Sequence, residues 1–297
     1  MAHNIIVRGR SFWCLAALVW LFPLFCPVMP AEAATTVEGV FALIGGTQQV
    51  GGELIATPSA TPTDLKLDIS FHRVAEKNAL KRYDTELNRQ MHVIAVSDDL
   101  RVFIHHHIAH VIDGHGQLRM MFPAPGLYHL YVDAAPTTIG QQVLRFDLMV
   151  GDDSATPLAV RPLEAPETSA RAGLYTLDFD RLDLAGGVAS QIKLHISEHG
   201  KPAQDLHEYL GVAAHVVLVG ADSLNYGHVH ALAGMAGMDM MKHDMADSEH
   251  PMAEGDAMVS ADLTLHLPAL PPGPYKLWVQ FMGGRTLYTV PFVTVVK

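Results

Sequence analysis

Six histidines recur with one spacing in two separate parts of the chain. Each set holds one histidine, a second thirteen residues later and a third two residues after that. Imidazole is the commonest protein ligand for transition metals, and a repeated spacing suggests that a fixed geometry of imidazoles is needed. The sequence therefore predicts two three-nitrogen metal sites suited to Cu(II) or Zn(II). The candidate ligands are His92, His105 and His107 in the first set and His215, His228 and His230 in the second.

Each set is expected on a β-hairpin. A turn near Asp99 places His92 opposite His107, and a turn near Asp222 pairs the first and third histidines of the second set in the same way. Directly opposed side chains have Cβ atoms about 5 Å apart. Side chains also alternate along a strand, so the second and third histidines share a face while His106 points away. Three imidazoles can therefore converge on one ion in each hairpin.

Other residues near the first hairpin extend or weaken this prediction. The fourth position of a three-nitrogen site is open to water, a thioether or a carboxylate such as Asp113. Three further histidines follow the first hairpin and have no counterparts in the second copy: His110, His115 and His129. They are expected either to form a surface site or to be solvated polar residues. The alternative is that the two sets have no metal role. In that case His92 and His215 are interior histidines whose rings bond to the backbone, and the His-x-His pairs lie on exposed strands.

A methionine-rich segment, 234–258, indicates a second kind of site. His107 and Pro125 are 18 positions apart, whereas His230 and Pro272 are 42 apart, so this segment is an insertion. It has no aromatic or β-branched residue with which to build a core. Thioether sulfur is a soft ligand that selects Cu(I). The candidate ligands are Met235, Met238, Met240, Met241, His243, Met245, His250 and Met252.

The two histidine sets belong to a larger duplication. Residues 66–72 match 193–199 upstream of them, and residues 125–132 match 272–279 downstream, in the same order. Between the copies, the stretch 152–170 is rich in proline, serine and threonine and is typical of a linker. The chain is therefore expected to hold two tandem domains, residues 34–151 and 171–297.

Each domain is expected to be an antiparallel β-sandwich, immunoglobulin-like or cupredoxin-like, in an all-β protein. The segments are short, rich in Val, Ile, Leu, Tyr and Thr, and separated by turn residues, with no long helical period. The predicted strands are 38–44, 50–56, 64–72, 91–97, 101–108, 117–122, 127–133 and 142–150 in the first copy, and 173–180, 190–197, 213–220, 224–231, 259–266, 274–282 and 286–296 in the second.

The N-terminal segment, 1–33, has the pattern of a secretory signal peptide. Arg8 and Arg10 precede an apolar run from residue 12 to 29, and Ala31 and Ala33 flank Glu32 as in a cleavage site. Both cysteines lie within this segment, which leaves no thiolate ligand elsewhere. A periplasmic or secreted protein is expected, with anchoring by the uncleaved segment as the alternative.

Composition and charge indicate which kinds of partner and activity the protein is suited to. With 31 acidic and 20 basic residues the formal net charge is −11, which makes nucleic acid an unsuitable partner, while 18 histidines suit cations. No serine or cysteine nucleophile constellation is found, and the repeated carboxylates Asp99 and Asp222 lie in predicted turns. The sequence therefore favours a binding protein over an enzyme.

Three sequence elements support a resemblance to a known family. They are the pattern His-Val-x-x-Val-x-x-Asp-Leu-x-x-Phe-x-His-x-His at 92–107, its weaker copy at 215–230 and the Phe-Pro-x-Pro-Gly-x-Tyr element at 122–128. The chain resembles a family of exported bacterial tandem β-sandwich proteins associated with copper and other heavy metals, over most of 60–150 and 190–295. The resemblance implies fold and compartment more than activity.

Taken with the ligand patterns, it favours a periplasmic protein that buffers, sequesters or delivers copper, with Cu(I) at the methionine segment and Cu(II) or Zn(II) at the histidines. A membrane metal transporter or another periplasmic protein is the expected partner. The alternatives are a non-metal interaction or adhesion module and a metal-dependent enzyme with a three-histidine site.

Overall fold

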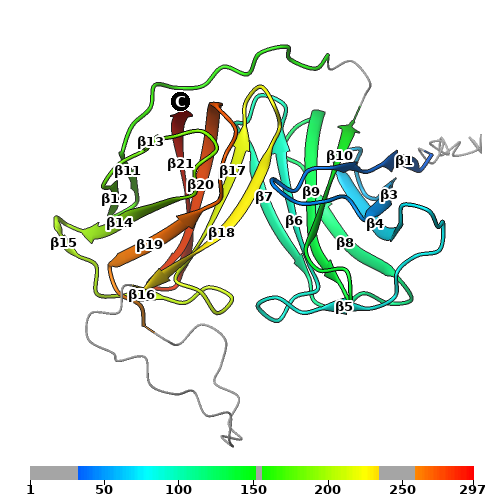
Figure 1. The fold of residues 1–297 in the computed structure, drawn as a ribbon, viewed down its shortest axis with the longest axis horizontal. Coiled ribbons are helices and arrows are strands. Elements are labelled where there is room, and N and C mark those ends of the chain that lie inside the picture. The colour runs from blue at the N-terminus through cyan, green and yellow to red at the C-terminus, as the bar shows by residue number, and fades with distance from the viewer. Residues whose placement is uncertain (1–32, 152–155, 234–257) are drawn as a thin grey trace, which may run out of the picture. The chain divides into compact units, whose positions relative to one another are not determined.

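The chain folds entirely into β-structure over the residues that the computed structural model describes, which are 33–151, 156–233 and 258–297 (Figure 1). Its strands are rich in β-branched and aromatic residues, which fit a pleated surface that is buried on at least one side. No helix in these ranges is long and apolar enough to cross a membrane. The predicted fold class, all-β with antiparallel sandwiches, is confirmed.

The first half is a sandwich of two sheets. One sheet has the order β1 (Thr35–Glu38), β3 (Val50–Pro58), β4 (Asp64–Arg73), β8 (His115–Met121). The other has the order β2 (Val40–Phe41), β10 (Gln142–Val150), β9 (Gly126–Pro136), β6 (Met91–Ser97), β7 (Phe103–Ile108), and β5 (Tyr83–Asp84) also pairs with β9.

The second half repeats this order. One sheet holds β11 (Ser169–Ala172), β12 (Tyr175–Phe179), β14 (Ser190–Glu198) and β19 (Asp262–Leu267); the other holds β13 (Asp183–Leu184), β21 (Thr286–Val296), β20 (Gly273–Gly283), β17 (Ala214–Gly220) and β18 (Tyr226–Ala233). Two short strands, β15 (Lys201–Pro202) and β16 (Leu206–His207), add to β14 and β20. Because β18 pairs with β19 as well as β17, the two sheets join along that side.

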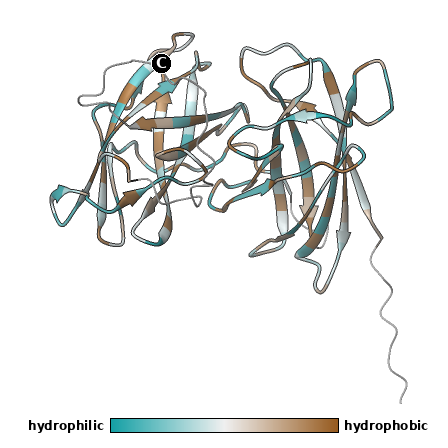
Figure 2. Ribbon diagram, turned by 90° about the horizontal axis from the view of Figure 1, so that it is seen from below, coloured by the Kyte–Doolittle hydropathy of each residue, from teal (hydrophilic) through white to brown (hydrophobic). Residues whose placement is uncertain are grey.

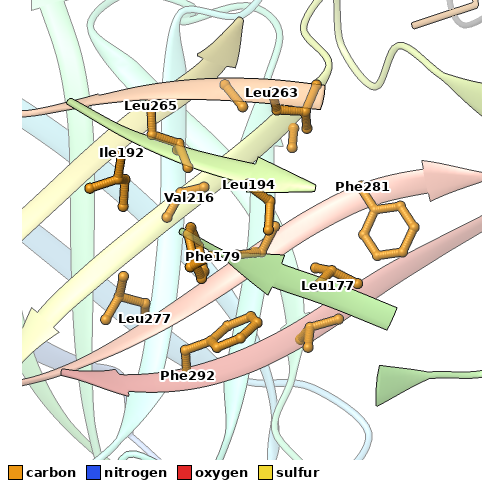
Figure 3. Packing of buried hydrophobic residues seen from close by; sticks show 14 of the residues in the cluster. Leu177, Phe179, Ile192, Leu194, Val216, Leu263, Leu265, Leu277, Phe281 and Phe292 are labelled. Atoms are coloured by element: carbon orange, nitrogen blue, oxygen red, sulfur yellow. The ribbon is translucent and has the colours of Figure 1, made fainter. Parts of the chain in front are cut away.

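Each sandwich has its own apolar core. Apolar and polar residues alternate along many strands, and Figure 2 shows this as changing colour along the arrows. In the second core, Phe179 of β12 meets Phe292 of β21 with ring centroids 4.9 Å apart. Figure 3 shows leucines of β14 and β19 and the rings of Phe281 and Phe292 gathered between the two sheets. Substituting one such buried ring by alanine costs about 3–5 kcal/mol.

A third apolar cluster joins the two sandwiches. On β6, Val93 and Ala95 belong to the first core, whereas Ile94 and Val96 belong to the joining cluster. Side chains alternate along a strand, so β6 is buried on both faces. The cluster is formed by Ile94, Val96, Leu100, Tyr131, Val143, Val217, Val219, Ala221, Tyr226 and Trp278.

Two pairs of aromatic rings cross this junction. Phe103 of β7 stacks on Trp278 of β20 with centroids 5.0 Å apart, and Tyr226 of β18 stacks on Tyr131 of β9 at 4.6 Å. Phe103 and Tyr226 occupy matching positions in the two copies, as do Tyr131 and Trp278. Each sandwich therefore presents the same surface to the other.

The structure corrects two details of the predicted strands. The single strand expected at 38–44 is two short strands, β1 and β2, which pair in different sheets. At the break, a Cβ on Gly39 would lie 2.9 Å from Phe146 Cε1, so a larger residue there would have to displace the Phe146 ring. The second sandwich also begins at Ser169, inside the stretch 152–170 expected to be linker, because β11 forms a hairpin with β12.

Candidate metal centre

Both histidine hairpins form with the predicted register. His92 lies opposite His107 in the β6–β7 pair, and His215 lies opposite His230 in the β17–β18 pair. His106, between the two inward histidines of β7, is exposed as predicted. Alternation along each hairpin therefore directs three imidazoles to one face.

The candidate ligand atoms of each triad lie within 4.8 Å of one another. A tetrahedral ion with metal–nitrogen bonds of about 2.0–2.1 Å would bring its nitrogens to about 3.3 Å apart. His215 Nδ1 and His228 Nε2 are already 3.2 Å apart. Each triad thus needs a contraction of the order of an ångström to hold an ion.

Backbone carbonyls orient the first histidine of each triad. His92 Nε2 lies 3.4 Å from the Glu86 carbonyl oxygen, and His215 Nε2 lies 3.1 Å from that of Tyr209. A carbonyl oxygen can only accept, so Nε2–H donates in both rings and Nδ1 keeps its lone pair. The same tautomer is therefore fixed at both positions.

The second histidine of each triad is oriented from the opposite sandwich. His105 Nδ1 lies 2.7 Å from Gln280 Oε1, and Gln280 Nε2 donates to Thr289 Oγ1 at 3.0 Å, which keeps the amide oxygen toward the ring. His228 Nδ1 lies 3.8 Å from Asp133 Oδ2. The hydrogen bond to Gln280 places the Nδ1 proton of His105 outward and leaves its Nε2 as the ligand atom. The His228–Asp133 separation is that of an ion pair and is too long for a hydrogen bond.

Four of these imidazole nitrogens are buried without a hydrogen-bond partner among the described residues. They are His92 Nδ1, His105 Nε2, His107 Nε2 and His230 Nε2. An unpartnered buried polar atom costs about 1–3 kcal/mol, so each one needs an explanation. For His92 and His105 they are the atoms that the hydrogen bonds above leave free. An ion in the first triad would satisfy three of the four atoms, and an ion in the second would satisfy His230 Nε2.

The two triads lie side by side. Ring centroids across the junction are 5.2 Å apart for His92 and His228, 5.4 Å for His105 and His228, and 5.5 Å for His105 and His215. These separations match those within the first triad, where His92 and His105 are 6.0 Å apart. The six rings therefore form one cluster, which we call the six-histidine centre.

Burial keeps the imidazoles of the six-histidine centre in their ligand form. Loss of water around the rings lowers the pKa of all six, and that of His105 falls to about 3. Neutral imidazole is the form that binds a metal. At pH 7 the centre is therefore ready to accept a cation without first releasing protons from its rings.

Two carboxyl groups of the first sandwich face the second triad. Asp133 on β9 is 2% exposed, and Gln141 Nε2 donates to both of its oxygens at 3.1 and 3.0 Å. Glu86 Oε1 lies 3.8 Å from His230 Nδ1. Burial raises the pKa of both carboxyls, and for Asp133 the Gln141 hydrogen bonds oppose this. A cation in the second triad would stabilise the ionised form of both carboxyls, which burial disfavours.

A pocket of about 330 Å³ reaches this part of the centre. Asp133 and His228 line it together with Gln141 and His266. Apolar residues, among them Leu43 and Tyr226, complete its wall. Of the three candidate ligands of the second triad, His228 alone lines the pocket.

Other predicted positions do not join the centre. Asp113, considered as a fourth ligand, is wrong in that role, because its carboxylate is exposed and lies 4.0 Å from Lys81 Nζ. His110 is exposed, and His115 pairs with Asp68 at 2.7 Å on the surface. His129 is neither solvated nor part of a surface site, since it is buried between Asp98 and Asp147.

The candidate ligands of the methionine-rich segment, from Met235 to Met252, lie outside the described residues. So do residues 1–32, which hold most of the expected signal peptide.

Sequence reasoning missed the residues that surround the ligands. Asp133 and Gln280 occupy matching places in the duplicated late strand, one residue beyond the repeated segments 125–132 and 272–279. A polar residue within an otherwise apolar strand was the available sign. Glu86 gave no such sign, because it precedes its strand in an ordinary polar turn.

Comparison with known proteins adds one match. A family model described as "Domain of unknown function (DUF8832)" matches residues 170–297, which is the second sandwich. Comparison with curated proteins finds no match. Function must therefore be argued from the six-histidine centre.

Proposed function

We propose that this is a periplasmic metal-binding protein that holds one transition-metal ion at each histidine triad, with copper as the native metal. The observation that carries the proposal is the set of four buried, unpartnered imidazole nitrogens within the two triads. In His92 and His105 a hydrogen bond on the opposite ring atom leaves this nitrogen free. Three neutral imidazoles with further coordination positions open suit Cu(II) or Zn(II).

Copper is favoured over zinc by the methionine-rich segment. This segment begins four residues after His230, at the end of the strand that carries two ligands of the second triad, and Met258 at its other end pairs with His207. Its thioethers suit Cu(I), whereas the imidazoles suit Cu(II). One chain would thus hold donors for both oxidation states.

The role proposed is buffering, sequestration or delivery of the ion, and not catalysis. The N-terminal pattern of residues 1–33 supports export, which would place the protein where copper is handled outside the cytoplasm. A membrane metal transporter or another periplasmic protein is the proposed receiver of the ion.

Titration of the metal-free protein with Cu(II) and with Zn(II), followed by calorimetry, tests the histidine sites. We expect two equivalents per chain for the unaltered protein and one for the double variant His105→Ala/His107→Ala. The matched control is His106→Ala, which removes the exposed histidine between those two and should keep both equivalents. Equal binding by the control and the double variant contradicts the proposal.

A separate titration with Cu(I) under reducing conditions tests the methionine-rich segment. Deleting residues 234–258 should remove the Cu(I) equivalents that the segment binds and leave the two Cu(II) equivalents unchanged. Cu(I) binding that survives the deletion in full contradicts this part of the proposal.

A further inference from the structure

The two triads share one ligand geometry but differ in the side chains of the opposite sandwich that face the ligand rings. In the first triad, His105 is held by the neutral amide of Gln280, 2.7 Å from its Nδ1. In the second, the matching ring of His228 faces the carboxyl of Asp133, and His230 faces the carboxyl of Glu86, each at 3.8 Å. Each triad is thus faced by residues of the opposite sandwich, and among the described residues only the second has carboxyl oxygens at ion-pair distance from its rings. The charge of Asp133 also acts on His92 of the first triad, where it opposes the lowering of the pKa by burial.

We propose that the second triad is the tighter of two unequal metal sites, and that Asp133 and Glu86 of the first sandwich make it so. The inference rests on the proposed function, because it concerns the relative strength of the same two sites.

The physical reason is the effect of a carboxylate on a coordinating imidazole. A carboxylate near a coordinating imidazole adds a negative charge close to the ion, and where it also accepts the outer ring proton it fixes the tautomer and raises the basicity of the ligand nitrogen. At 3.8 Å the carboxyls of Asp133 and Glu86 act on the rings by charge and not through a hydrogen bond. Loss of such a partner typically weakens metal binding by roughly 10–100-fold. An amide fixes the tautomer as well, but it adds no charge, so Gln280 gives the first triad only part of this benefit.

The position of Asp133 fits this role. Its side chain is almost fully buried, where an isolated carboxylate is costly, and Gln141 holds both of its oxygens in place. A dication within the triad offsets that cost, because bound metal ions are the largest local charges and favour a nearby carboxylate. Asp133 and the second triad therefore stabilise each other only when the ion is bound.

The test isolates one triad at a time and measures Zn(II) affinity by competition with a chromophoric chelator. The His105→Ala/His107→Ala variant keeps the second triad, and His228→Ala/His230→Ala keeps the first. We expect the variant that keeps the second triad to bind Zn(II) at least 10-fold more tightly. Adding Asp133→Asn should reduce that advantage, because it should weaken the second triad more than the first, on which the charge of Asp133 also acts.

The substitution Gln280→Glu tests the opposite change, a gain in Zn(II) affinity at the first triad. In the variant that keeps the first triad, this substitution should strengthen Zn(II) binding several-fold, because it supplies the missing carboxylate behind His105. Glu86→Gln should weaken the second triad alone. Circular dichroism checks that each variant is folded, and the Glu86 and Gln280 variants keep the test decisive if Asp133→Asn does not fold.

Two failures are distinguishable. If the unaltered protein binds neither Cu(II) nor Zn(II), the proposed function is wrong. If it binds two ions with equal affinity, or if Asp133→Asn weakens both triads alike, the metal sites stand and the assignment of Asp133 is overturned.

Discussion

The two histidine hairpins carry the same ligands in the same register, yet their surroundings differ. His92 and His215 both donate Nε2–H to a carbonyl six residues earlier, so this contact is built into the hairpin itself. The groups behind the second histidines come from the opposite sandwich, and there the copies diverge to Gln280 and Asp133. The positions of the three ligands in a triad therefore depend on one copy alone. The polar groups that face the ligand rings depend on the packing of the two copies.

The same contrast holds at the position that follows the first strand of each hairpin. Asp98 in the first copy matches Ala221 in the second, and Arg161 of the connecting segment bonds to both, through the Asp98 carboxylate and the Ala221 carbonyl oxygen. His129 lies in contact with the same guanidinium at 3.0 Å. One residue of the connection thus joins the two copies at matching places, by a charge on one side and by backbone on the other.

Acidification is expected to have the largest effect, and it tests whether the two triads are alike in burial. All six pKa values lie below the ordinary histidine value of about 6.5, so the unfolded chain binds more protons than the folded one once the pH falls below that value. Stability is complete above about pH 6.5 and is lost below it, by up to about 1.4 kcal/mol per pH unit for each buried ring.

Thermal unfolding of the metal-free protein between pH 7.5 and 5.5 measures this loss. The variants His105→Ala/His107→Ala and His228→Ala/His230→Ala should each reduce the pH dependence by a similar amount, because burial is the main cause in both triads. A melting temperature that is independent of pH in this range contradicts the expectation.

Replacing Arg161 by alanine should be the next largest effect and should break the asymmetric link between the copies. It leaves Asp98 buried without its cation, which typically costs about 3–5 kcal/mol. Urea unfolding measures the change. Arg181→Ala, which removes an exposed arginine bonded to the Gln191 carbonyl oxygen, is the control and should cost less than about 1 kcal/mol.

Metal binding should sharpen the difference between the triads. An ion present at about 100 times its dissociation constant stabilises the folded state by about 2.7 kcal/mol. At a limiting Zn(II) concentration the variant that keeps the second triad should gain more in melting temperature than the variant that keeps the first. A chelator should remove the gain in both, and equal gains would count against unequal sites.

The smallest effects are expected at two surface contacts between a histidine and an aspartate, one in each sandwich. Asp68 accepts from His115 at 2.7 Å in the first sandwich, and at the matching position His195 pairs with Asp262 at 2.7 Å in the second. Exposed pairs contribute about 0–1 kcal/mol. His115→Ala and His195→Ala should therefore change stability little and keep both metal equivalents, and loss of an equivalent would assign these histidines a metal role.

Local sequence patterns predicted the strands and the hairpin registers because both depend on neighbours in the chain. Strand β6 was expected at 91–97 and β10 at 142–150, and both form with those bounds. The short strands β5, β13, β15 and β16 were missed, since a strand of two residues has no periodicity to detect. The start of β11 was missed because its pattern lies among the prolines and threonines of the connection.

The three-ligand sets were predicted, but their union into one six-histidine centre was not. That union depends on the packing of one sandwich on the other, which no spacing within a copy encodes. A sign was nevertheless present, because β6 and β17 read as almost unbroken apolar runs after their histidines, as expected of strands buried on both faces. Asp133 and Gln280 acquire their roles only once that packing is known.

The aromatic contacts at the junction bear on how such a centre arises. Phe103 with Trp278 and Tyr226 with Tyr131 repeat one contact in both directions, which is the arrangement of an isologous interface between two copies of one subunit. A single sandwich with this surface would pair with itself and bring two identical triads together. Joining the copies in one chain removes that constraint, so one half can gain an acid that the other lacks, and a symmetric pair of sites becomes an ordered pair.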